Sequence, residues 1–399
     1  MKKISAVLLI LALVGGALFA SFTGNASVSL GVDLDTKAYG FTNATALEAD
    51  ITILERLVDK AGEGDIYAEI NAELSLGIDY GGAGNLEDAL VGTAEITSAK
   101  IVGDNWYVGI LKALGAPNFA SSAIEWDADD NKSLLNLGFA GTVGHGVTVG
   151  VGDFTFGFAM PYTTNNFGTG KYDVALTAVT PEFKFADGLT GKFGVAGQLS
   201  DADMVGFASA KVAFAQDDLS VSLATDLGFG KATPFAVEVA VAAVYDFINA
   251  DIYYGLKDYS TSAPQLYGGR DHIVSVQVGA EIEGFDITVT GKDLVNIQDL
   301  SASVDYAIND QVLVGVNGGF VIYTKAWSAG AKAEYKHDMF KATASVALLG
   351  TDAVDSVTAK VGVSSTTLVD GATLALNYVS GNFLADELGA ITAKATIAF

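Results

Sequence analysis

The feature that most restricts the fold of this chain is a strict alternation of apolar residues with polar or small ones. In the segment IYAEINAELSLGI, residues 66–78, every second position starting from Ile66 is Ile, Ala or Leu. A period of two residues is the period of a β-strand with one apolar face and one wet face. The pattern recurs along the chain, so it predicts an all-β protein whose strands each have an apolar face.

The composition indicates that this apolar surface is extensive. Of the residues, 50% are hydrophobic and only 17% are charged, and the mean hydropathy of +0.37 is apolar for a water-soluble protein of this length. Beyond residue 20 the longest apolar runs, such as Phe235–Ile248, contain acids and fall short of the roughly 20 residues of a membrane-spanning helix. The hydrophobicity is therefore spread over strands, and 46 Gly with 5 Pro suit strands joined by tight turns.

Residues 1–20 have the form of a secretory signal peptide. The basic start MKK precedes the apolar run Ile4–Ala20, which ends in small residues. We predict cleavage after Ala20, with Ala17 as a second candidate and an uncleaved anchor as the alternative. The absence of Cys excludes structural disulfides and lipid attachment through an N-terminal Cys. Residues 21–399 are therefore predicted to be the exported protein, folded as a single barrel.

The net charge limits the partners of the exported chain. It is −25 for the full sequence and −27 without Lys2 and Lys3 of the predicted signal peptide. Nucleic acid is an unsuitable partner, because its binding requires Lys and Arg that neutralise phosphates. Anionic membrane surfaces repel such a chain as well, which leaves insertion into a membrane or free solution.

The connections between the predicted strands alternate between short and long. We predict about 22 strands, within a range of about 18 to 24 because strand boundaries are hard to place from sequence. Turns such as Gly152–Asp153 and His337–Asp338 alternate with the long segments Lys112–Ser133, Pro161–Lys171 and Asp258–Arg270. Short turns at one end and long loops at the other are typical of an outer-membrane β-barrel. We therefore predict that the long loops are extracellular and that both termini are periplasmic.

Three segments depart from this pattern. The connections Leu54–Gly64 and Ser364–Gly371 are longer than the others on the short side. Leu134–Val151 is predicted as one strand, although it is long enough to contain a hairpin. Tyr172–Phe185 is predicted as one continuous strand.

A soluble β-sandwich is the alternative that would show the same alternation. Its inner faces favour bulky residues and its outer faces are charged, whereas the polar faces here are mild and the aromatic residues gather near strand ends, as Tyr245 and Tyr323 do. The last segment, GAITAKATIAF, alternates as well and ends in Phe. Ile397 and Phe399 therefore resemble the C-terminal signal by which outer-membrane barrels are recognised for assembly.

Three segments near the N-terminus carry a resemblance to a known family. GVDLDTKAYGFTNAT at residues 31–45, GEGDIYAEI at 62–70 and AKIVGDNWYVGI at 99–110 resemble the treponemal, or spirochaete, major outer sheath protein family. The resemblance implies an outer-membrane porin that is also a surface adhesin and antigen. It also implies an alternative layout, with residues to about 150 in the periplasm and only the C-terminal part in the barrel; the alternation through both parts favours one barrel.

No segment predicts an enzyme, a cofactor or a metal site. His145, His272 and His337 lack ligand-like spacing. DADDN, residues 127–131, begins like a calcium loop, but Lys132 and Gly138 stand where that loop needs Gly and Glu. An outer-membrane hydrolase with a site scattered over several strands is the enzyme alternative, and an adhesin with little channel role is the non-enzyme alternative.

The phase of the alternation predicts which side chains line a lumen. These candidates are Glu69, Asn71, Glu73, Asp226, Gln277, Glu281, Asp286, Lys292, Asp305, Asn317, Lys332, Glu334, Lys341, Asn377 and Lys394. Acids exceed bases among them, so a wide channel for small hydrophilic solutes with weak cation selectivity is predicted. The acidic loop with Glu125, Asp127, Asp129 and Asp130 is a candidate constriction if it folds into the channel.

The predicted partners follow from this class of protein. They are outer-membrane lipid, the barrel assembly machinery and small hydrophilic solutes. Host matrix proteins are implied by the family resemblance alone. A homotrimer is expected by analogy with porins in general.

Overall fold

The structure of the chain is a computed structural model, and it describes residues 20–51, 66–78, 90–111, 114–125, 132–135, 146–160, 173–200, 204–230, 235–258 and 272–398. It divides into two compact units. The first unit contains residues 1–104, 305–316 and 328–399, and the second contains residues 105–304 and 317–327. The predicted signal peptide before Ala20 lies outside the described residues.

The first unit contains the N-terminal and C-terminal strands. They are β1 (Ala20–Asp33), β2 (Tyr39–Ile51), β3 (Tyr67–Ile78), β4 (Leu90–Gly103), β20 (Lys341–Gly350), β21 (Val354–Val369), β22 (Ala372–Val379) and β23 (Ala390–Ala398). A short 3-10 helix, η2 (Phe383–Ala385), precedes β23.

The second unit contains the central strands. They are β5 (Trp106–Leu111), β6 (Gly146–Val151), β7 (Phe154–Ala159), β8 (Asp173–Val179), β9 (Phe183–Ala186), β10 (Leu189–Ser200), β11 (Met204–Gln216), β12 (Leu219–Gly230), β13 (Phe235–Tyr245), β14 (Ile248–Asp258), β15 (His272–Ile282) and β16 (Phe285–Lys292). Residues of both units contribute to β17 (Asp299–Ala307), β18 (Val312–Val321) and β19 (Ala326–Lys336).

Within each unit the strands run up and down and pair with their neighbours in sequence. Every pairing from β10 to β16 is antiparallel and follows the chain order. In the first unit, β1 pairs with β2 and also with β23, so that Val28 lies opposite Asn43 on one side and Ala395 on the other. A last strand that returns to the first gives an up-and-down sheet the topology of a β-barrel. The predicted fold class is therefore confirmed.

The strand count agrees with the prediction once an interruption at Pro181 is taken into account. Both β8 and β9 pair with β10, so they are two halves of one strand. Proline has no N–H to donate to a ladder, and here the N–H and hydroxyl of Thr180 bond with the backbone of Phe193 instead. When β8 and β9 are counted as one strand, the 23 strands found in the described residues become 22. The prediction of one continuous strand over Tyr172–Phe185 is wrong only at this break.

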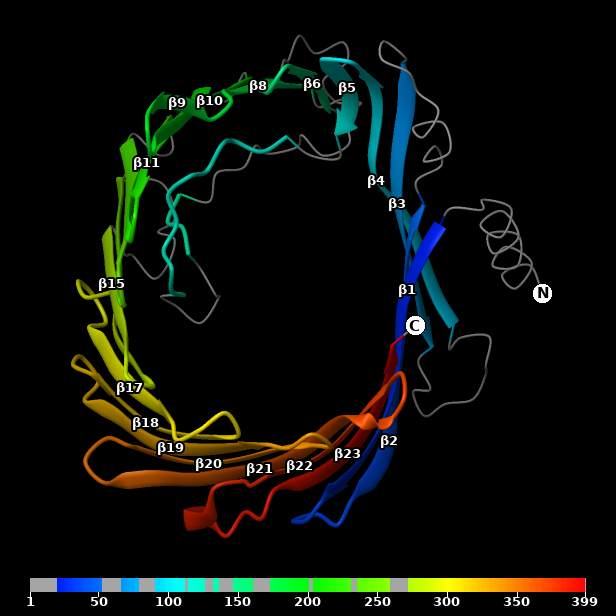
Figure 1. Ribbon diagram of the computed structural model, residues 1–399, viewed down its shortest axis with the longest axis vertical. Helices are drawn as coiled ribbons and strands as arrows, with labels where there is room; N and C mark the ends of the chain where they lie inside the picture. Colours follow the sequence, from blue (N-terminus) through cyan, green and yellow to red (C-terminus); the bar gives the residue numbers. More distant parts are fainter. Residues whose placement is uncertain are drawn as a thin grey trace. The chain divides into compact units, whose positions relative to one another are not determined.

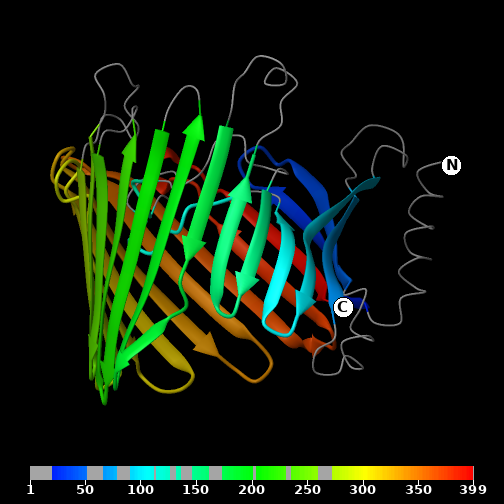
Figure 2. The ribbon, with the colours of Figure 1, turned by 90° about the horizontal axis from the view of Figure 1, so that it is seen from above.

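Tight turns recur at one end of the strands. Asp217, Asp246 and Glu283 each adopt a positive φ, near 50°, in the hairpins that join β11 to β12, β13 to β14 and β15 to β16. Such values match the primed turns that fit the twist of antiparallel strands. Because these hairpins are separated by two strands each, they lie at the same end of the second unit's sheet (Figure 2). The predicted alternation of connections is therefore present in this unit.

Two of the predicted boundaries are wrong. The segment Ser364–Gly371 is not a long connection, because β21 continues to Val369 with a register shift between Ser365 and Val369. A two-residue turn then follows, in which Gly371 has a φ of +71°. Leu134 and Leu135, predicted to begin a strand, lie outside any strand, and β6 begins only at Gly146. Leu54–Gly64 falls outside the part of the chain that the structure describes.

Among the described residues no helix is both long enough and apolar enough to cross a membrane.

Candidate functional site

The second unit has one polar and one apolar face. Residues 114–125 lie on the concave side of its curved sheet, along β8–β15 (Figure 1). Residues 132–135 contact the same face, and the two stretches together are called the segment below. Asp226 of β12 lies opposite Glu238 of β13 in the register, and both side chains are fully buried beneath this segment. The residues on either side of Asp226 in sequence, Thr225 and Leu227, point the other way, as the pleat requires. The concave face is therefore the polar face that the alternation predicts.

The segment follows a single row of the sheet. Strand pairing places seven residues side by side across β8 to β15: Val179, Gly194, Ser209, Asp226, Glu238, Gly255 and Ile273. Pro117 accepts a 2.7 Å hydrogen bond from the Ser209 hydroxyl through its carbonyl oxygen. Leu134, at the other end of the segment, packs on Ile273. Residues 117–120 and 133–135 therefore cross the strands along this row.

Asp226 holds the first part of the segment. The backbone N–H of Phe119 donates to both carboxylate oxygens, at 3.1 and 3.0 Å, and the N–H of Ala120 donates to Oδ2 at 2.5 Å. Hydrogen bonds that end on a charged acceptor are about twice as strong as neutral ones. Asp226 thus supplies the acceptors that two N–H groups outside regular structure would otherwise lack.

Glu238 holds the second part. Its Oε1 accepts hydrogen bonds from the N–H of Leu135 at 2.7 Å and from the Tyr253 hydroxyl at 2.7 Å. Both of its oxygens also accept from the Ser133 hydroxyl, at 2.9 and 3.0 Å. The Tyr253 hydroxyl oxygen in turn accepts from the N–H of Leu134 at 2.9 Å. Each polar group in this buried network has a partner, which is the condition for such a network to add rigidity.

Apolar contacts complete the attachment. Leu114 packs with Ala159 and Ala175, and Leu134 packs with Tyr253 and Ile273; all six are at most 4% exposed. The sheet residue next to Pro117 is a glycine, and a Cβ on Gly194 would lie only 2.6 Å from Pro117 Cβ. A side chain there would displace the segment from the sheet.

Two basic residues lie close to the site. Lys257 of β14 is buried and interacts electrostatically with Glu238. Lys192 of β10 places its Nζ 5.6 Å from the centre of the Phe119 ring, within the range of a cation–π contact. The sequence did not predict Lys192, Tyr253 or Lys257, because all three belong to the ordinary polar positions of alternating strands. Glu238 was missed because it lies in an apolar run.

The acidic loop is described at its two ends. Glu125 and Lys132 form an exposed ion pair of 3.5 Å, and the N–H of Ser122 donates to the carbonyl of Lys132 at 2.7 Å. Asp127, Asp129 and Asp130 lie outside the described residues. The two ends of this loop are therefore brought together on the concave face, next to residues 117–120.

The other predicted lining residues are distributed over both units. In the second unit, Asp251 lies opposite Gln277, and Glu281 lies opposite Asp286, in the same phase as Asp226. Lys292, two residues beyond Thr290 on β16, shares this phase, and Asn317 is exposed on β18. These residues are spread over β14, β15, β16 and β18, and in the described part of the chain no hydrogen bond or ion pair joins them to Asp226 or Glu238.

In the first unit, the predicted residues form two groups of ion pairs. Lys332 bonds to Asp305 at 2.6 Å, whereas Glu334 pairs with Lys341 at 2.7 Å and with Lys336 at 3.4 Å. Asn377 lies opposite Thr392, and Lys394 lies opposite Ala375 and is exposed. Glu69 lies opposite Lys100, with a register shift after Asn71 that brings Glu73 opposite Glu95. The side chains of Glu69, Asn71 and Glu73 are not among those described.

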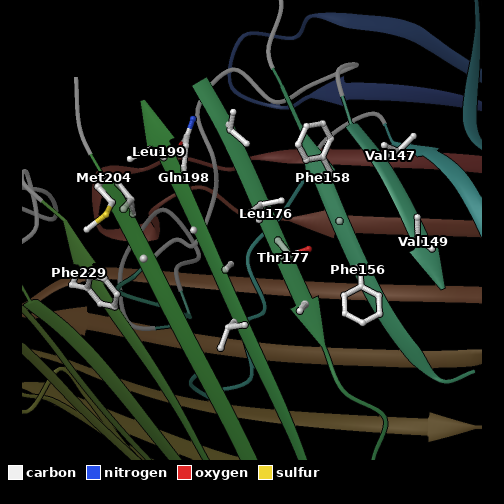
Figure 3. Close-up of a pocket in the computed structure, with 18 residues that line it drawn as sticks. Val147, Val149, Phe156, Phe158, Leu176, Thr177, Gln198, Leu199, Met204 and Phe229 are labelled. Atoms are coloured by element: carbon white, nitrogen blue, oxygen red, sulfur yellow. The ribbon is translucent and has the colours of Figure 1, made fainter. Parts of the chain in front are cut away.

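The opposite face of the sheet exposes large apolar side chains. Phe156, Phe158 and Leu176, in the phase opposite to Ala159 and Ala175, are 44%, 40% and 54% exposed. Figure 3 shows them with Val147, Met204 and Phe229 around a shallow apolar depression of about 830 Å³. A soluble sandwich would bury such a face. In the described residues no second layer covers it, so the sandwich alternative is wrong.

The described residues give no indication of a metal site. They contain no cluster of three or more His, Cys, Asp and Glu side chains placed to hold a metal ion. Of the predicted assembly signal, Ile397 is exposed on β23 in the same phase as Ile391, and Phe399 is outside the described residues. The concave face with its attached segment is therefore the candidate site.

Comparison with known proteins gives similarity at the level of structure alone. No protein-family model and no curated protein sequence matches the chain. Solved structures that resemble it include variants of the porin of Rhodopseudomonas blastica. One is 12% identical and covers 96% of this chain and 100% of its own with a TM-score of 0.36. Another is 11% identical and covers 62% and 97% with a TM-score of 0.35. A structure described under asymmetric conductivity of engineered proteins is 12% identical, with coverage of 96% and 100% and a TM-score of 0.36.

A TM-score below 0.5 does not establish a common fold, so the class of this protein rests on its own strands. It is an all-β, antiparallel up-and-down protein with barrel topology, whose polar concave face carries an attached segment and whose apolar face is exposed.

Proposed function

We propose that this protein is an outer-membrane porin, a passive channel for small hydrophilic solutes. The observation that carries the proposal is the inverted distribution of polarity in the second unit. Charged Asp226, Glu238 and Lys257 are buried on the concave face, while Phe and Leu side chains are exposed on the convex face. Only an apolar solvent makes that convex face favourable, and strands that pair with one another satisfy their backbone groups within a bilayer.

The exposed apolar side chains support the first two partners that we propose, outer-membrane lipid and the barrel assembly machinery. At about 25 cal/mol per Å² of apolar surface removed from water, contact of this face with lipid acyl chains supplies a large driving force for insertion. The exposed row Ile391, Ala393 and Ile397 on β23 supports recognition by the barrel assembly machinery. Pairing of β1 with β23 supports one barrel from residue 21 to the C-terminus over the layout with a periplasmic N-terminal part. A homotrimer and membership in the spirochaete major outer sheath protein family are proposed from the analogy and the resemblance.

We propose weak cation selectivity because exposed acidic residues gather at one end of the second unit's strands. Asp226 and Glu238 are fully buried beneath the segment, so neither faces the water of the channel directly. Hairpin residues Asp153, Asp218 and Asp246 remain exposed at one end of the second unit. Their field extends only about 8 to 10 Å at physiological salt, so the preference for cations is small. Reversal potentials across a potassium chloride gradient measure its sign, and a value that indicates anion preference would refute it.

Liposome swelling tests the proposed channel. Liposomes that contain the refolded protein are expected to swell in isotonic solutions of small sugars and to stop swelling as the sugars become larger, because the lumen has a finite width. Heat-denatured protein in the same lipid is the control. If swelling equals that of the control for every sugar, the protein is not an open pore.

Cysteine labelling tests the proposed orientation. Asp338 and Asp352 are exposed in the two connections that flank β20, so they lie at opposite ends of the same strand. In the Cys-free chain, Asp352→Cys is expected to react with an impermeant maleimide on intact cells, and Asp338→Cys only after the outer membrane is opened. The reverse pattern would mean that the tight turns face outward.

The adhesin role stays a proposal from the family resemblance. It belongs to the long loops, above all Asp258–Arg270, of which residues 259–271 lie outside the described residues. Deleting this loop is expected to abolish host-protein binding and to leave conductance intact. Binding that survives the deletion would remove this loop from consideration.

A further inference from the structure

The first unit contains a hollow that the pore proposal leaves without a role. It lies on the polar face of β19–β22, and its volume is about 590 Å³. Its lining includes Lys332, Glu334, Thr343, Ser345, Lys360, Asn377 and Thr392. A volume of this size is within the range of sites for small molecules.

Gly362 forms the floor of the hollow. Strand pairing places it between Thr343 on β20 and Asn377 on β22, and Asn377 in turn lies opposite Thr392 on β23. A Cβ at residue 362 would lie 2.7 Å from Asn377 Oδ1 and 3.0 Å from Thr343 Oγ1. Because residue 362 has no side chain, Asn377 Oδ1 and Thr343 Oγ1 can lie close over its backbone. A larger residue here would displace these two polar atoms without changing any charge.

The polar groups around this floor are not bonded to one another. No hydrogen bond joins the side chains of Thr343, Ser345, Asn377 or Thr392 to another group of the described chain. The four side chains together offer three hydroxyl groups and one amide, each able to donate and to accept. They suit a ligand that carries several hydroxyl groups.

The charge of the hollow is positive. Two lysines, Lys332 and Lys360, and one carboxylate, Glu334, line it; Lys336, Lys341 and Asp305 take part in ion pairs with these lining residues. Asp305 forms an ion pair with Lys332, and Glu334 forms ion pairs with both Lys336 and Lys341. Lys360, which lies opposite Ser345 in the register, forms no ion pair within the described residues and is exposed. An ammonium group beside free hydroxyl and amide groups favours an anion.

We propose that this hollow is a binding subsite for a small polyhydroxylated anion, such as a hexose phosphate or a hydroxylated carboxylate. Lys360 pairs with the negative group, and Thr343, Ser345, Asn377 and Thr392 bond to the ligand's hydroxyl groups. The subsite deepens the proposed function and rests on it, because it would concentrate such solutes on the channel wall. It does not set the ion selectivity, which follows from charge at the ends of the channel.

Binding is tested on the refolded protein in detergent micelles, without reference to conduction. Phosphorus NMR of a hexose monophosphate is expected to show line broadening that the neutral hexose does not compete away at equal concentration. Lys360→Gln is expected to weaken binding about tenfold or more, the loss of one hydrogen bond to a charged group. Gly362→Val, which fills the floor and suits a strand, is expected to abolish the broadening.

Lys394→Gln is the matched control. It removes the same charge from the same wall, but Lys394 lies opposite Ala375, one row away from Gly362, and does not line the hollow. Equal weakening by Lys360→Gln and Lys394→Gln would show a diffuse charge effect and overturn the subsite. Absence of broadening in a preparation that forms channels overturns it as well. Binding by a protein that forms no channel would uphold the subsite and refute the pore.

Discussion

Replacing Asp226 by Asn and Glu238 by Gln together is expected to release the attached segment from the wall and to widen the channel. The two carboxylates accept the N–H groups of Phe119, Ala120 and Leu135. An amide in place of each carboxylate removes the charge and turns an acceptor into a donor that faces another donor. Bonds to charged groups contribute about 1.5–3 kcal/mol each.

The expected size of this effect follows from the energy of the lost bonds. One hydrogen bond is lost at each former carboxylate, because the amide keeps one accepting oxygen. Loss of these two bonds raises the detached fraction of the segment by about a hundredfold or more, since each 1.4 kcal/mol is a factor of ten. Single-channel conductance is expected to rise and open-channel noise to increase. Trypsin is expected to cut faster after Lys132, which lies next to Ser133 in the released part.

A matched control separates this effect from a general change in charge. Glu281 of β15 is exposed in the phase of Asp226, and no hydrogen bond joins its side chain to the described part of the segment. Glu281→Gln is expected to leave conductance and cleavage at Lys132 nearly unchanged. If the double variant behaves as Glu281→Gln does, Asp226 and Glu238 do not hold the segment.

Replacing Ala395 by Pro is expected to prevent assembly of the protein. Ala395 lies in the middle of β23, opposite Val28 of β1 and Leu374 of β22. Proline removes the N–H donor, and its ring disturbs the neighbouring strand, so it is found almost only on edge strands and at bulges. The sheet would then be interrupted where its first and last strands meet.

Heat-modifiable electrophoretic mobility after refolding in detergent measures this outcome. The wild type is expected to show a compact band that shifts on boiling, and Ala395→Pro to show the unfolded band alone. Ala395→Val, which keeps the N–H and suits a strand, is expected to refold. A normally folded proline variant would mean that β23 has a free edge and that β1 and β23 do not pair.

The strands could be predicted from sequence because their physical cause is local. Each strand separates an apolar from a polar face with a period of two, which single residues report independently. The break at Pro181 also has a local cause that the sequence shows, because a proline within a long alternating run has no N–H to donate to the ladder.

The attachment of the segment could not be predicted because it is not local. Asp226 is separated by more than a hundred residues from the N–H groups it binds, and no pattern in sequence marks such a pair. Leu134 and Leu135 resemble the start of a strand, yet Leu134 packs between Tyr253 and Ile273 on strands far along the chain. The role of Glu238 also depends on burial, which its apolar neighbours conceal.

Planar-bilayer recording of the refolded wild-type protein tests the central claim most directly. An open porin is expected to give discrete, long-lived current steps in potassium chloride, with a reversal potential that indicates a small preference for potassium. Protein that inserts but gives no steps, or steps equally frequent in a heat-denatured sample, would contradict the assignment as a porin.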